Sequence, residues 1–349
     1  MNINQLVRPN ILKMKAYSSA RDEFKGAASV FLDANENPYD NDGLNRYPDP
    51  LAMAVKNEIA KLKNVKAENI FLGNGSDEVI DVLIRIFCEP RVDNIVTLPP
   101  TYGMYQVSAD TADVAVRVVN LTPDFQPNIE EILRGADGHS KILFICSPNN
   151  PTANNIEPSK LLNLLNSFNG IAVIDEAYID FSTQQSCIDW LETFPNLIVI
   201  QTFSKAWGMA GMRLGMAFAS KEIIDLMNKV KAPYNVNELT QRAALDLLKN
   251  KAAKKDAAVK EILVEREKMA SILRGYAFVE KVYPSDANFL LVKIPQPNAM
   301  YQWLLTHGIV VRNRNNVVLC EDCLRLTVGT PEENAILMKA FKESQFLIS

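Results

Sequence analysis

The stretch LIVIQTFSKAWGMAGMRLGMAFA (residues 197–219) joins two apolar runs, 197–201 and 214–219, through a segment with one lysine, Lys205, and one arginine, Arg213. Short apolar runs bounded by glycine and polar residues are typical of buried strands. The ordinary interpretation makes Lys205 a surface residue and Arg213 half of an ion pair. The alternative makes Lys205 a nucleophilic amine and Arg213 the holder of an anion, and the rest of the chain decides between them.

Further apolar runs precede this stretch and are predicted strands: NIVTL (94–98), VAVRVV (114–119), KILFIC (141–146) and IAVID (171–175). Between several of them lie amphipathic segments, such as 77–87 and 158–168, whose apolar residues recur with helical spacing. Buried strands that alternate with helices are typical of a mostly parallel sheet covered on both faces. We therefore predict an α/β fold whose ligand binds beyond the carboxyl ends of the strands.

The pattern changes after residue 220, where helical segments are followed by a mixture of strands and helices through residue 345. This change indicates a second, smaller lobe of the α+β type. We expect the segment before residue 50 to join that lobe. The expected parts are an N-terminal arm (1–28), a small α+β domain (29–50 with 250–349) and a large ligand-binding domain (51–249).

Composition excludes several classes of function. The 349 residues carry a net charge of −4 and no long basic run, which argues against a nucleic-acid-binding face. No apolar run approaches the roughly 20 residues of a membrane span, and no export signal is evident. The five cysteines lie mostly in apolar segments, which indicates reduced thiols and a cytoplasmic protein. One CxxC (Cys320, Cys323) and two histidines are too few to predict a metal site.

Two polar motifs follow predicted strands. In GNGSDE (73–78), the backbone N–H groups of a helix start can bind phosphate, although Ser76 and Asp77 also fit an ordinary N-cap, which we favour from this motif alone. In IAVIDEAY (171–178), Asp175 ends a buried strand, where a carboxylate is costly without a cation. Asp175 either caps the next helix or faces a protonated pyridine nitrogen, with Tyr178 near the ring hydroxyl.

Taken together, these motifs meet the needs of one cofactor. A phosphate-binding turn, Asp175, Lys205 and Arg213 follow one another at predicted strand ends. Pyridoxal 5'-phosphate needs a lysine amine for covalent attachment, an acid opposite its ring nitrogen, and cations or helix ends for its phosphate. The order and shared location of these residues favour a pyridoxal-phosphate site over a surface lysine.

These motifs carry a resemblance to a known family. The chain resembles the fold-type I aminotransferases of the aspartate aminotransferase superfamily, and more closely the histidinol-phosphate aminotransferases among the class II enzymes. The segments that carry the resemblance are DANENPY (33–39), LNRYPDP (44–50), GNGSDEVIDVLIRIFCEP (73–90), PPTYGMY (99–105), CSPNNPT (146–152), DEAYIDF (175–181), TFSKAWGMAGMRLG (202–215) and LRLTVGT (324–330).

The resemblance implies a role for each matching residue. Lys205 bonds to the cofactor and moves the proton, Asp175 pairs with the ring nitrogen, and Tyr178 contacts the ring hydroxyl. Asn150 joins Tyr178 at that hydroxyl, and Tyr102 stacks on the ring. The residues implied to hold the cofactor phosphate are Gly75, Ser76, Asp77, Thr202, Ser204 and Arg213, with Tyr47 reaching the phosphate of the neighbouring subunit in a homodimer.

The resemblance also implies the substrates, histidinol phosphate and glutamate or 2-oxoglutarate. Arg325 is implied to bind the substrate anion, with Arg312 and Tyr17 as further anion contacts and Asn35 in the pocket. Ordinary structural roles, such as a salt bridge for Arg312, remain an alternative for Arg312, Tyr17 and Asn35. One departure is Ala153, where the family's motif continues with glycine. The alternatives on the same fold are an aromatic amino-acid aminotransferase and a threonine-phosphate decarboxylase, and one of another class is a non-catalytic regulator.

Overall fold

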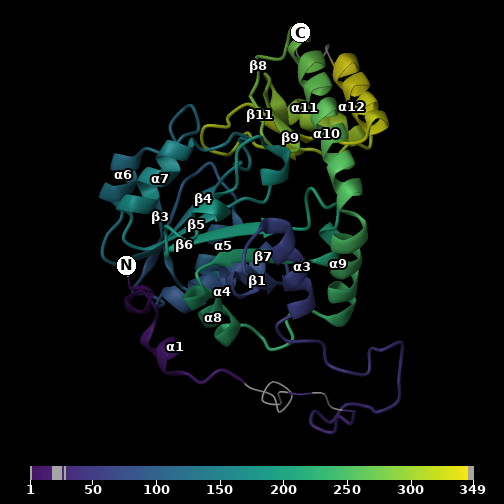
Figure 1. Cartoon of the computed structure of the whole chain (residues 1–349). Helices are drawn as coiled ribbons and strands as arrows, with labels where there is room; N and C mark the ends of the chain where they lie inside the picture. Colours follow the sequence, from purple (N-terminus) through teal and green to yellow (C-terminus); the bar gives the residue numbers. More distant parts are fainter. Residues whose placement is uncertain (1, 18–25, 27–28, 345–349) are drawn as a thin grey trace.

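The computed structural model describes residues 2–17, 26 and 29–344. Its centre is a seven-stranded sheet (Figure 1). The strands lie side by side in the order β1 (Ile70–Gly73), β7 (Gly215–Ala219), β6 (Leu197–Thr202), β5 (Ile171–Asp175), β4 (Ser140–Cys146), β2 (Asn94–Thr97) and β3 (Ala115–Val118). Strands from β6 to β3 run parallel, whereas β7 is antiparallel to both β6 and β1. The predicted mostly parallel sheet is confirmed.

Helices cover both faces of this sheet because side chains alternate along each buried strand. In β5, Ile171 and Val173 face one core, while Ala172 and Ile174 face the other. The first core is completed by α1 (Pro9–Lys13), α4 (Ser76–Phe87), α5 (Met104–Thr111) and α8 (Lys221–Val230). The second is completed by α3 (Met53–Lys63), α6 (Ile129–Gly135), α7 (Pro158–Ser167) and α9 (Glu238–Asn250).

A smaller lobe contains an antiparallel sheet. Its strands lie in the order β10 (Arg312–Asn313), β11 (Cys323–Thr327), β9 (Phe289–Lys293) and β8 (Lys281–Val282). Its helices are α10 (Ala252–Arg274), α11 (Pro297–Thr306) and α12 (Pro331–Glu343). Figure 1 shows α10 running from beside the large sheet to the small one. A separate apolar cluster joins the lobes by packing Tyr178 and Ala206 with Phe289. Among the helices of the described residues, none combines the length and the apolar character that crossing a bilayer needs.

The segment 29–50 runs as an extended chain outside the lobes (Figure 1). Arg242 of α9 donates hydrogen bonds to the carbonyls of Asp42 (3.0 Å) and Gly43 (2.8 Å). Tyr47 stacks on Tyr234, with 4.5 Å between ring centroids. These contacts tie the segment to α9 and the loop before it. Its expected membership of the small domain, and the three domain boundaries, stay predictions.

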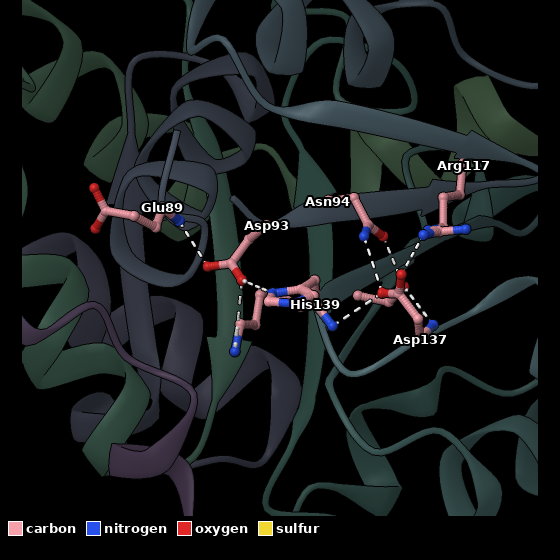
Figure 2. A network of polar contacts seen from close by, with 8 residues as sticks. Glu89, Asp93, Asn94, Arg117, Asp137 and His139 are labelled. Carbon is pink, nitrogen blue, oxygen red and sulfur yellow. Dashed lines mark hydrogen bonds and ion pairs between the residues drawn. The ribbon is translucent and has the colours of Figure 1, made fainter. Parts of the chain in front are cut away.

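A network of hydrogen bonds and ion pairs links side chains at the amino ends of β2 and β4 (Figure 2). Asp93 Oδ1 lies 3.5 Å from His139 Nδ1. Asp137 accepts a hydrogen bond from Asn94, the first residue of β2, at 3.1 Å and forms an ion pair with Arg117. Since parallel strands point the same way, this network lies at the sheet edge opposite their carboxyl ends.

Candidate active site

A cavity of about 700 Å³ opens at the carboxyl ends of β4, β5 and β6, where the small sheet approaches the large one. Most of the residues that we expected to bind cofactor or substrate line it. They are Ser76, Asp77, Tyr102, Asn150, Asp175, Tyr178, Thr202, Ser204, Lys205, Arg213, Arg312 and Arg325. The rule that ligands bind beyond the carboxyl ends of parallel strands therefore located the cavity.

Three of the expected residues lie elsewhere in this chain. Tyr17 and Tyr47 are 68% and 50% exposed. Asn35 and Tyr47 line a second hollow, beside Tyr234. Tyr47 was expected to act in a neighbouring subunit, so a single chain does not test its role. The roles of all three residues stay predictions.

The start of α4 borders the cavity. Its N-cap is Gly75, which has no side chain to cap the helix and takes φ = +81°. The N-cap interpretation of Ser76 and Asp77 is therefore wrong, because Ser76 is already the first helical residue. Asp77 instead accepts hydrogen bonds from the hydroxyl of Tyr102 (3.0 Å) and the guanidinium of Arg213 (3.2 Å). Backbone N–H groups at such a helix start attract anions.

Two glycines allow the chain to close around this helix start. A Cβ on Gly75 would lie 2.7 Å from Nη2 of Arg213. A Cβ on Gly215, the first residue of β7, would lie only 2.3 Å from the backbone nitrogen of Ser76. The close approach of Arg213 and β7 to the start of α4 is therefore possible only because both positions lack a side chain.

Lys205 stands three residues after the end of β6. Its Nζ lies 5.5 Å from the centroid of the Tyr178 ring, inside the cavity. Partial desolvation there lowers the pKa of Lys205, and the cations of Arg325 and Arg213 lower it further, against the opposing effect of Asp175. The site therefore makes the neutral, nucleophilic form of this amine easier to reach than it is in water.

Asp175 ends β5 as a buried carboxylate, 3% exposed. Its Oδ2 accepts a hydrogen bond from the hydroxyl of Tyr105 at 2.7 Å, and its Oδ1 accepts one from the N–H of Ala177 at 3.1 Å. Burial raises the pKa of Asp175, while the Tyr105 and Ala177 hydrogen bonds lower it. The net effect is a raised pKa, and these two donors offset part of the cost of burying the ionised carboxylate.

Tyr105 was missed by sequence reasoning. It is fully buried in α5 and stacks on Phe144 of β4 with 4.6 Å between ring centroids. A signal was present, because Tyr105 lies three residues after Tyr102 and closes the PPTYGMY motif. Its ring packs in the core, and its hydroxyl donates a hydrogen bond to Asp175 in the site.

Replacing Tyr105 with phenylalanine is expected to raise the pKa of Asp175, because it removes a hydrogen bond that lowers this pKa. Losing a buried hydrogen bond to a charged group costs about 1.5–3 kcal/mol, which corresponds to a roughly ten- to hundredfold fall in kcat if Asp175 must be ionised. A pH titration of kcat measures the change. Tyr276→Phe, which removes a hydroxyl bonded to the Met338 carbonyl in the small lobe, is the control and should leave the profile unchanged.

A chain of polar groups links the small sheet to Tyr178. Nη1 of Arg325 donates to Oδ1 of Asn150 at 2.5 Å, and the amide nitrogen of Asn150 lies 3.5 Å from the Tyr178 hydroxyl. Burial raises the pKa of Tyr178, so its hydroxyl keeps its proton. Arg314, which we did not single out from the sequence, also lines this side of the cavity.

Ala153, which stands where the resemblance predicts glycine, takes a left-handed turn. Its φ is +70°, in the left-handed region that costs an L-residue roughly 1–2 kcal/mol. The turn is held by its N–H, which donates to Asn149 (2.7 Å), and by its carbonyl, which accepts from Asp286 (2.7 Å). The substitution leaves Asn150 and Pro151 on the cavity wall.

The fold and this site define the fold-type I class of transferases, in which a lysine and an aspartate meet at the carboxyl edge of a large, mostly parallel sheet. The family model of aminotransferase class I and II matches residues 16–341. Histidinol-phosphate aminotransferases of Parabacteroides distasonis and Christiangramia forsetii are each 55% identical to the chain, with 98% of both sequences covered. The chain therefore belongs to the class I and II aminotransferase family, in its histidinol-phosphate aminotransferase branch.

Solved structures agree on the fold. The histidinol-phosphate aminotransferase of Clostridium acetobutylicum matches with a TM-score of 0.80 at 25% identity, covering 87% of this chain and 92% of that one. An L-threonine-O-3-phosphate decarboxylase of Porphyromonas gingivalis also matches, with a TM-score of 0.72 at 22% identity, covering 88% of this chain and 92% of that one. The shared fold alone therefore does not separate these two activities.

Proposed function

We propose that the chain is a pyridoxal-phosphate-dependent transaminase that moves an amino group between histidinol phosphate and 2-oxoglutarate, giving imidazole-acetol phosphate and glutamate in histidine biosynthesis. The observation that carries the proposal is one cavity with two separate anion sites. Arg213 and the start of α4 form one, and the arginines of the small sheet form the other. The positive charges of Arg213 and Arg325 both lower the pKa of Lys205.

The residues present fit the cofactor. The helix start at Ser76, the hydroxyls of Thr202 and Ser204 and the guanidinium of Arg213 supply donors for a phosphate. The hydroxyl of Ser204 accepts a hydrogen bond from that of Thr202 at 3.0 Å, so these two donors lie side by side. The missing side chains at Gly75 and Gly215 let the Arg213 guanidinium and the backbone of β7 lie close against the start of α4.

When bound, the cofactor supplies an electron sink that stabilises negative charge on the substrate carbon. Nζ of Lys205, whose deprotonation the lowered pKa assists, would take the proton from that carbon and return it on the cofactor side. Asp175 would hold the positive ring nitrogen, and the hydroxyl of Tyr178, which lies 3.5 Å from the amide nitrogen of Asn150, would orient the ring oxygen together with that amide. Arg325 binds the substrate phosphate in one half-reaction and a carboxylate in the other.

The lowered pKa of Lys205 predicts a pH dependence. Capture of pyridoxal phosphate by the apoenzyme needs the neutral amine, so its rate should rise with pH through an apparent pKa below the ordinary lysine value of 10.5. Arg325→Gln removes a cation that lowers this pKa, so it should move the midpoint upward. Stopped-flow absorbance measures the rate, and Arg134→Gln on the exposed face of α6 is the control.

The proposed transamination is tested by its two half-reactions. Histidinol phosphate added to holoenzyme without an oxo acid should change the cofactor absorbance stoichiometrically and release imidazole-acetol phosphate. Subsequent 2-oxoglutarate should restore the spectrum and yield glutamate. A spectrum that histidinol phosphate leaves unchanged would contradict the proposal.

The proposal includes a homodimer in the cytoplasm. Segment 29–50 and its surroundings expose many apolar side chains, as expected of a surface that a second copy covers. They include Val30, Leu32, Tyr39, Leu44, Tyr47, Met53 and Leu239. The five cysteines are all free and buried, which supports a reducing compartment. Sedimentation analysis tests the dimer, because a monomeric active holoenzyme would contradict it.

A further inference from the structure

The small sheet presents three arginines to the cavity, of which the proposed function assigns two. Arg312 and Arg325 were expected to bind the substrate anion. Arg314 lines the same cavity, and the proposed function assigns it no role.

The strand geometry puts all three guanidinium groups on one face. Arg312 of β10 lies directly opposite Arg325 of β11 in the antiparallel pair. The N–H of Arg314 donates to the carbonyl of Cys323 at 2.9 Å and so continues this ladder. Because side chains alternate along a strand, Arg314 shares its face with Arg312 and therefore with Arg325.

No ion pair joins any of these three arginines to a carboxylate among the residues that the structure describes. Two acids line the cavity, and both are engaged elsewhere, Asp77 with Arg213 and Asp175 with Tyr105. Within the described part of the chain, the buried Nε atoms of Arg314 and Arg325 have no hydrogen-bond partner. Burial, followed by the charges of Arg325 and Arg312, lowers the pKa of Arg314 to about 10. Like charges held this close are unfavourable unless an anion joins them.

We propose that Arg314 is a specificity-determining residue that, with Arg312 and Arg325, binds the dianionic phosphate of the phosphorylated substrate. The proposal rests on the proposed function of the cavity. A phosphate monoester carries a charge of about −1.5 to −2 at pH 7 and three acceptor oxygens, whereas each carboxylate of glutamate carries one charge and two oxygens. The third arginine therefore matters most for the phosphate.

The test compares holoenzymes carrying Arg314→Gln, Arg314→Lys and the control Arg134→Gln. In Arg314→Gln, we expect kcat/KM for histidinol phosphate to fall roughly 10- to 100-fold, mainly through KM, while kcat/KM for glutamate changes less than about threefold. Arg314→Lys should recover part of the loss. Below the second phosphate pKa of about 6, the wild-type preference should shrink toward that of Arg314→Gln.

Inorganic phosphate provides a test that does not depend on turnover of histidinol phosphate. As a competitive inhibitor of the glutamate reaction, it should bind Arg314→Gln more weakly than the wild type. Equal losses of kcat/KM for both substrates, or an unchanged inhibition constant for phosphate, would overturn the proposal. If the wild type does not use histidinol phosphate but phosphate inhibition still depends on Arg314, the proposed substrate is wrong and the anion role of Arg314 stands.

Discussion

Lys205→Ala is expected to reduce turnover by roughly 10⁴-fold or more, because it removes both the covalent anchor and the group that moves the proton. The absorbance of lysine-bound cofactor should also disappear. The geometry explains the size of the effect: the amine of Lys205 lies 5.5 Å from the Tyr178 ring, in a cavity where desolvation lowers its pKa. Absorbance spectroscopy and steady-state kinetics on the same preparation measure both quantities.

Lys221→Ala is the matched control. Lys221 lies on α8, away from the cavity, and forms an exposed ion pair with Asp225 at 2.6 Å. It should keep the wild-type spectrum and rate, because exposed pairs contribute little to stability. A full spectrum and normal turnover in Lys205→Ala would remove this lysine from the mechanism.

Gly215→Ala is expected to have the second-largest effect. The added methyl would lie 2.3 Å from the nitrogen of Ser76 and 2.4 Å from the carbonyl carbon of Gly75, and backbone atoms cannot move aside as a side chain end can. Overpacking of this kind typically costs about 1–3 kcal/mol of unfolding free energy. It also displaces the start of α4, so we expect cofactor affinity to fall by at least about tenfold.

Gly211→Ala separates this steric effect from a general effect of losing a glycine. No atom of the described residues other than its chain neighbours lies within 4 Å of the position that its Cβ would take. Thermal unfolding and cofactor titration should show Gly211→Ala close to wild type and Gly215→Ala impaired in both. Equal behaviour of the two variants would show that the close approach of β7 to α4 is unimportant.

Local pattern located most strands of the large sheet, although β1 (Ile70–Gly73) was not among the predicted runs. The run 171–175 coincides with β5, because buried parallel strands are marked by continuous apolar residues. The antiparallel direction of β7 was not predictable from its sequence, since an apolar run reads the same for either direction. Candidates such as Asp175, the last residue of β5, and Lys205, three residues after β6, could be singled out because charged residues are conspicuous at the ends of buried strands.

The rest of the site depends on contacts between distant segments. Ser76 and Asp77 fit a local capping rule, but the N-cap is Gly75. Tyr105 looks like a core residue, and its partner Asp175 is 70 positions away. Arg314 directly follows the short strand β10. Which side of the small sheet its side chain faces depends on the pairing with β11. For Tyr47, the predicted role lies in a second subunit, which one chain does not contain.

The most direct test of the central claim is a substrate comparison. Histidinol phosphate, phenylalanine, tyrosine and threonine phosphate are each assayed with the holoenzyme and 2-oxoglutarate, following glutamate and carbon dioxide. The account predicts the highest kcat/KM for histidinol phosphate, with glutamate formed and no carbon dioxide released. Preference for phenylalanine, or release of carbon dioxide from threonine phosphate without an oxo acid, would contradict it.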